Sequence, residues 1–87
     1  MSEIVARPRV GWVVQNEGIG LIDVDGADLG SIPYPYAAVW DFLVKGYSVE
    51  RCVSLFAVMA GVDLEKARTS VGLCLSSWEK RRYIEVR

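Results

Sequence analysis

The sequence predicts an α+β domain of the winged helix-turn-helix type, in which a three-stranded antiparallel sheet precedes three helices. Short runs of β-branched and aromatic residues, separated by turn signals, indicate strands before residue 33. Apolar residues at spacings of three and four indicate helices after it. Eighty-seven residues fit one domain. We expect that domain over residues 10–87, and a flexible N-terminal arm over residues 1–9.

The three strands follow from the alternation and the turns. Residues 10–15 alternate between two faces and predict the first strand. Residues 19–24 predict the second, and the Asp25-Gly26 hairpin signal turns the chain back into a third strand over residues 27–32. That third strand precedes Pro33, and we expect it to form one edge of the sheet, either open or covered by the N-terminal arm or a second copy.

The pairing register of the third strand is open at this stage. A two-residue loop would place Ile22, Val24 and Leu29 on one face of the sheet. Ile32 would then point to the opposite face, unless a bulge intervenes near Gly30.

The three helices have recognisable ends. The first begins at residues 34–36 with a proline in its first turn and stops at Gly46. Ser48 caps the second helix, which ends at Gly61, and Asp63 caps the third. The residues expected in the core are Trp12, Tyr36, Val39, Trp40, Leu43, Val49, Cys52, Val53, Phe56, Met59, Ala60, Leu64, Ala67, Val71, Cys74, Leu75 and Trp78.

The C-terminal half of the third helix carries residues that lie off its apolar stripe. Leu73 is apolar but falls off the apolar stripe, among polar residues. Lys80 and Arg81 stand near the helix C-terminus, where the helix dipole favours cations. Residues 83–86 predict a short tail strand.

Composition narrows the class of protein. Ten Lys and Arg against eleven Asp and Glu give a net charge of −1, which offers little attraction for nucleic acid. No apolar run reaches the ~18–20 residues that span a bilayer, and the N-terminus lacks a signal pattern, so we expect a cytoplasmic protein with no membrane partner. The chain has no His and two Cys. It therefore lacks the usual general base and a ligand set for zinc or iron–sulfur, and we expect a binding module without cofactor rather than an enzyme.

A series of motifs resembles the PqqD family, whose members are also called RiPP recognition elements. In chain order they are Arg7-Pro8, Gly20-Leu21-Ile22-Asp23, the first-helix run from Ala37 to Leu43, Gly46-Tyr47-Ser48-Val49, Val62-Asp63, Val71, Cys74-Leu75, Trp78 and Tyr83-Ile84. Ile32-Pro33 stands where the family has Leu-Asn, and Cys74 where it has an aromatic residue or Leu. The sequence therefore resembles a divergent, stand-alone PqqD-like protein more than the protein of pyrroloquinoline quinone biosynthesis itself.

The resemblance implies a peptide chaperone of natural-product biosynthesis. Such a domain captures the leader segment of a ribosomally synthesised precursor peptide and presents the peptide to a modifying enzyme, of the radical S-adenosylmethionine type. The leader adds a strand to the third strand, in a groove closed by the third helix. The peptide-binding residues expected here are Asp28, Leu29, Gly30, Ser31, Ile32, Leu73, Ser77, Lys80 and Arg81. Leu73 is the candidate apolar anchor, and the two cations attract an acidic peptide.

Two other functions remain open. In a winged-helix DNA-binding protein, the third helix would be the recognition helix, supported by its basic residues. The acidic residues Asp23, Asp25 and Asp28 around the hairpin, and the net charge, oppose this. In a structural homodimer, the edge strand would pair with its own copy.

Overall fold

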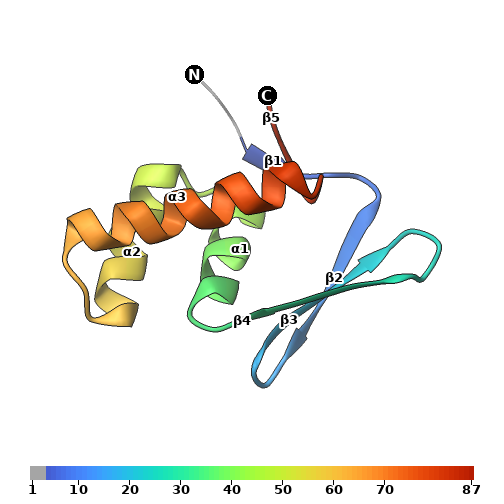
Figure 1. Ribbon diagram of the computed structural model, residues 1–87, viewed down its shortest axis with the longest axis horizontal. Helices are drawn as coiled ribbons and strands as arrows, with labels where there is room; N and C mark the ends of the chain where they lie inside the picture. Colours follow the sequence, from blue (N-terminus) through green and yellow to red (C-terminus); the bar gives the residue numbers. More distant parts are fainter. Residues whose placement is uncertain (1–3) are drawn as a thin grey trace.

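The computed structural model describes residues 4–87, in which a three-stranded antiparallel sheet is followed by three helices (Figure 1). This confirms the predicted α+β fold. The elements are β1 (Ile4–Ala6), β2 (Val10–Gln15), β3 (Gly18–Asp23), β4 (Asp28–Pro33), α1 (Tyr36–Val44), α2 (Val49–Ala60), α3 (Leu64–Lys80) and β5 (Ile84–Val86). No helix within residues 4–87 is both long enough and apolar enough to cross a membrane.

The sheet has the order β2-β3-β4, and a bulge in β4 sets its register. Leu21 pairs with Gly30 and Ile22 pairs with Asp28, so Leu29 is the extra residue. Gly30 has a φ of +107°, a conformation that glycine adopts without steric cost. The bulge that the sequence left open is therefore present, and it directs Ile32 into the core beside Ile19.

The hairpin between β3 and β4 differs from the predicted two-residue loop. Asp23 N–H donates to the Ala27 carbonyl (2.8 Å), which leaves three residues in the loop. Gly26 takes a φ of +88° in it, as three-residue hairpin loops require at their last position. Val24 consequently lies in the loop and is 69% exposed, so it does not share a face with Ile22 and Leu29 as a two-residue loop would require.

Part of the flexible arm expected over residues 1–9 forms a strand. Residues 1–3 lie outside the described part, but residues 4–6 form β1, which pairs antiparallel with β5. Ile4 and Ala6 pack against the core, and the tail strand supplies their backbone partners. The predicted tail strand is thus present, and it anchors the N-terminal segment beside the C-terminal end of α3 (Figure 1).

The helices begin where their capping residues predicted. The Ser48 hydroxyl accepts from Arg51 N–H (3.2 Å), and the Asp63 carboxylate accepts from Lys66 N–H (2.8 Å). Gly61 ends α2 in the left-handed conformation. The buried core comprises Ile19, Leu21, Ile32, Ala37, Val39, Trp40, Leu43, Cys52, Val53, Phe56, Ala57, Ala67, Val71, Trp78 and Ile84.

Four residues predicted for the core lie largely outside it: Trp12, Tyr36, Met59 and Leu64. Trp12 is 39% exposed because β2 is an outer strand of the sheet, although its ring still contacts that of Trp40 edge to face. Leu64 is exposed in the first turn of α3.

Candidate functional site

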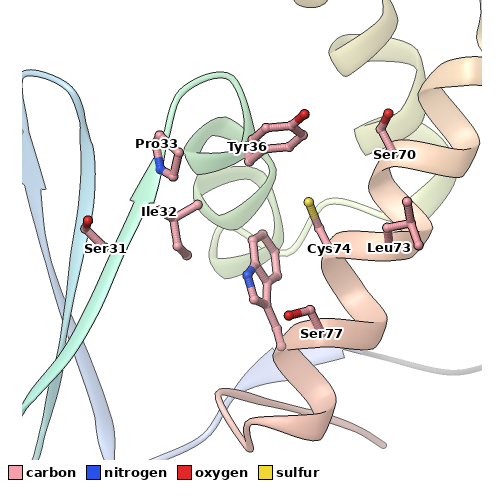
Figure 2. Close-up of a pocket in the computed structure, with 9 residues that line it drawn as sticks. Ser31, Ile32, Pro33, Tyr36, Ser70, Leu73, Cys74 and Ser77 are labelled. Carbon is pink, nitrogen blue, oxygen red and sulfur yellow. The ribbon is translucent and has the colours of Figure 1, made fainter.

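A groove of about 350 Å³ lies between β4 and α3 (Figure 2). Its lining residues are Ser31, Ile32, Pro33, Tyr36, Ser70, Leu73, Cys74, Ser77 and Trp78. The strand provides one wall, the helix provides the other, and Tyr36 lies at the start of α1 (Figure 2). The groove is therefore built from elements that are distant in the sequence.

The strand wall is a sheet edge. Within residues 4–87, β4 pairs only with β3. Tyr34 N–H, just after the strand, donates to the Glu17 carbonyl of the hairpin before β3 (3.1 Å). Backbone groups alternate in direction along an antiparallel strand, so those of Ser31 and Pro33 point away from β3. Ser31 offers an N–H and a carbonyl to this open edge, and Pro33 offers a carbonyl alone, which is compatible with an edge position.

The floor of the groove is apolar. Ile32 and Trp78 belong to the core and are 6% exposed, and their remaining surface faces the groove. Cys74 is half-buried beside them, and burial raises the pKa of its thiol, so the thiol stays neutral at neutral pH. A neutral Cys side chain behaves as a small apolar group. The floor is thus suited to an apolar side chain of a ligand.

The rim combines one exposed apolar side chain with several hydroxyl groups. Leu73 is 68% exposed, so it is not an ordinary core residue. Hydroxyl groups come from Ser31, Ser70, Ser77 and Tyr36. Such groups both donate and accept hydrogen bonds, as an extended peptide backbone does. The groove therefore has the features of a site for an extended, partly apolar segment.

Four of the nine predicted site residues lie together in this groove: Ser31, Ile32, Leu73 and Ser77. The other five do not line it. Asp28 and Gly30 bond to each other, the Asp28 carboxylate accepting from Gly30 N–H (2.8 Å), and the Leu29 carbonyl accepts from the Tyr83 hydroxyl (3.0 Å).

Lys80 and Arg81 are exposed at the C-terminal end of α3. Neither forms a salt bridge with a carboxylate in the described part of the chain. Because neither residue lines the groove, their charges lie outside it.

Sequence reasoning missed five lining residues: Pro33, Tyr36, Ser70, Cys74 and Trp78. Two of them, Ser70 and Cys74, carried a usable signal, because each lies three positions before a predicted residue, Leu73 or Ser77, and so shares a helix face with it. Cys74 and Trp78 were assigned to the core alone, whereas they both support the core and form the floor.

The described residues contain no cluster of three or more His, Cys, Asp or Glu side chains that could hold a metal ion. Burial raises the pKa of Cys52 to about 11, and this thiol lies in the core away from the groove. We therefore interpret the groove as a binding surface built from apolar and hydroxyl groups.

Comparison with solved structures defines the class of fold. This is the α+β fold of RiPP recognition elements, the PqqD-like class that the sequence motifs resemble. One similar structure is lasso peptide synthetase B1 complexed with the leader peptide, with a TM-score of 0.82 at 17% identity, covering 95% of this chain and 98% of that chain.

A second is TbiB1 in complex with the TbiA(beta) leader peptide, with a TM-score of 0.82 at 15% identity, covering 92% of this chain and 93% of that chain. At these identities the likeness establishes the fold. No protein-family model and no curated protein sequence matches the chain.

Proposed function

We propose that this protein binds the leader segment of a ribosomally synthesised precursor peptide and presents the peptide to a modifying enzyme. The observation that carries the proposal is the groove, where the open edge of β4 faces the exposed Leu73 of α3. An open edge accepts an extended peptide as an added strand, and a neighbouring pocket selects its side chains. Two proteins of the same fold are complexed with leader peptides, which supports this choice of ligand.

Favourable binding of a peptide requires both the open edge of β4 and the apolar surface of the groove. The carbonyl and N–H of Ser31 and the carbonyl of Pro33 provide about three backbone hydrogen bonds, each worth roughly 0.5–1.5 kcal/mol net. Ordering about five peptide residues costs about 1–2 kcal/mol per residue. Backbone pairing alone is therefore insufficient. Burial of an apolar peptide side chain against Leu73 and the floor contributes about 1.5–3 kcal/mol per side chain, so favourable binding requires the burial of several such side chains.

The cations at the end of α3 favour an acidic leader. Lys80 and Arg81 are exposed and close to the groove in sequence, since Ser77 and Trp78 line it. Exposed charges of this kind mainly raise the association rate, and salt screens them. We therefore expect the association rate to fall with ionic strength more than the dissociation rate changes.

For the enzyme partner we propose the radical S-adenosylmethionine type that the family resemblance implies. A specific observation favours a second candidate: one of the two similar structures is a lasso peptide synthetase subunit. Pull-down with a radical enzyme and with a lasso-forming enzyme encoded beside the gene, each in the presence of the precursor, distinguishes the two.

The experiment that tests leader binding is an NMR titration of the ¹⁵N-labelled protein. The probe is the leader of a short precursor peptide encoded beside the gene, synthesised as overlapping 20-residue peptides. We expect amide shifts over residues 29–32 and residues 73–80. Unchanged amide signals in both segments at saturating peptide would exclude the groove as the site.

Two controls separate the alternative functions. Sedimentation without peptide tests a homodimer paired through β4, which the leader should dissociate if both use the same edge. A DNA duplex at low salt tests the winged-helix alternative, for which we expect no shift along α3 because the net charge is −1.

A further inference from the structure

Tyr83 connects the segment after α3 to the edge strand. Its hydroxyl donates to the Leu29 carbonyl (3.0 Å), a contact between residues 54 positions apart. Its backbone is fixed as well, since Tyr83 N–H donates to the Trp78 carbonyl (2.9 Å) and the Tyr83 carbonyl accepts from Arg7 N–H (3.0 Å). The side chain therefore extends from a well-anchored position, and the bond to Leu29 bridges β4 and the C-terminal end of α3.

This bridge lies at one end of the groove. The strand residues that line the groove begin at Ser31, and the helix residues that line it end at Trp78. Leu29 and Tyr83 are the next connected pair beyond them. The groove is therefore closed at the Leu29 end by a hydrogen bond within the protein.

The opposite end of the groove continues along α3. Ser70 lines the groove on the same side as Tyr36 (Figure 2). It also lines a second hollow of about 470 Å³ at the N-terminal part of α3. The other residues of that hollow are Val62, Asp63, Glu65, Lys66 and Thr69. A peptide seated in the groove thus has room to continue beyond Pro33 but not beyond Leu29.

We propose that Tyr83 is a positioning residue that limits backbone pairing to the stretch from Ser31 to Pro33 and so fixes the register of the bound leader. This inference rests on the proposed function. The Leu29 carbonyl is the acceptor that a longer added strand would use next, and the Tyr83 hydroxyl already occupies it.

The inference predicts how many peptide amides become protected. In the native protein, the free acceptors on the edge are the carbonyls of Ser31 and Pro33, so two peptide N–H groups gain slow hydrogen exchange. Tyr83→Phe keeps the ring and frees the Leu29 carbonyl, so a third peptide N–H becomes protected. The affinity changes by less than about threefold, because the new hydrogen bond is offset by the ordering of one more peptide residue.

The measurement is amide exchange of the ¹⁵N-labelled leader bound to each protein. Tyr47→Phe is the matched control, because the Tyr47 hydroxyl makes no hydrogen bond within residues 4–87 and its ring stacks on Phe42 away from the groove. Two protected amides in the Tyr83→Phe complex, or three in the wild-type complex, would overturn the inference while leaving leader binding intact. A leader that does not bind the wild-type groove would overturn the proposed function itself.

A second measurement needs no variant of Tyr83. Leaders are shortened one residue at a time from the end that lies toward Leu29. Removing residues beyond the one that pairs with Ser31 should leave the wild-type Kd within about twofold, whereas removing the Ser31 partner should weaken it about tenfold or more. Progressive weakening from residues beyond Ser31 would contradict the proposed limit.

Discussion

Trp40 and Trp78 pack edge to face, with ring centroids 5.4 Å apart and an angle of 81° between their planes. Trp40 is fully buried in α1, and Trp78 is a buried residue of α3 that also lines the groove. One aromatic contact therefore joins the core to the floor of the candidate site. The shape of the floor depends on how α1 and α3 pack.

Replacing Trp78 should damage the fold as well as the groove. We expect Trp78→Ala to lower the free energy of unfolding by about 3–5 kcal/mol, because it removes a buried ring and leaves a cavity against Trp40. Urea unfolding followed by circular dichroism measures the loss. Trp12→Ala is the control, since Trp12 also contacts Trp40 but is 39% exposed, and it should cost clearly less. Equal losses would contradict the central position assigned to Trp78.

Replacing Leu73 should weaken leader binding without destabilising the protein. The side chain is 68% exposed, so Leu73→Asp should change the unfolding free energy little. It should raise the Kd for the leader about 10- to 100-fold, because it removes an apolar contact of about 1.5–3 kcal/mol. Val58→Asp is the matched control on α2, 82% exposed and outside the groove, and it should leave the Kd unchanged. Isothermal titration calorimetry of both variants with the leader measures the two Kd values. Similar affinities would show that Leu73 does not contact the leader.

Ser31→Pro tests backbone pairing at the edge. Proline removes the outward N–H of residue 31, and edge strands tolerate proline. The Kd should rise about 3- to 10-fold, as expected for one lost hydrogen bond of roughly 0.5–1.5 kcal/mol. Ser31→Ala keeps the N–H and should bind nearly as the wild type does. If a folded Ser31→Pro protein binds with unchanged affinity, the N–H of Ser31 does not pair with the peptide.

Cys74 provides a chemical probe of the groove. Its thiol is half-buried in the floor, whereas Cys52 is fully buried in the core, so iodoacetamide should modify Cys74 faster. Burial raises the pKa of Cys74, so its rate should still be increasing above about pH 9. Leader at about ten times its Kd should slow the reaction about tenfold, in proportion to the free protein. Mass spectrometry of tryptic fragments measures each cysteine separately, and an unprotected Cys74 would place the leader elsewhere.

The buried thiol of Cys52 makes the free energy of unfolding depend on pH in the alkaline range. Burial raises its pKa to about 11, from an ordinary value of 9.0. The unfolded chain therefore loses this proton at lower pH than the folded protein does. The contribution of the neutral Cys52 thiol to the free energy of unfolding is fully present below about pH 9. It is lost as the pH rises toward about 11, and the loss is on the order of 2 kcal/mol.

Urea unfolding of the wild type and Cys52→Ala over this pH range isolates the effect from other titrating groups. The stability advantage of the wild type should shrink as the pH rises. The half-buried Cys74→Ala variant should show a smaller change. A constant difference between wild type and Cys52→Ala would contradict the prediction.

The sequence by itself determined the three helices, the three strands of the sheet and the tail strand, in their order, but it did not predict β1. Hydrophobic periodicity and the caps Ser48 and Asp63 are local signals, and they predicted the helices that the structure contains. The same periodicity placed Leu73 off the core stripe, where it is indeed exposed in the groove. These features depend on residues only a few positions apart, so a linear pattern encodes them fully.

Only the tertiary structure decided the register of β4 and the contacts along its edge. The bulge at Leu29 depends on pairing between strands, and a shift of one residue reverses every side chain of a strand. The pairing of β1 with β5 and the bond from Tyr83 to Leu29 join segments more than 50 residues apart. Contacts over such separations leave no periodic trace in the sequence, because each depends on how the whole core packs.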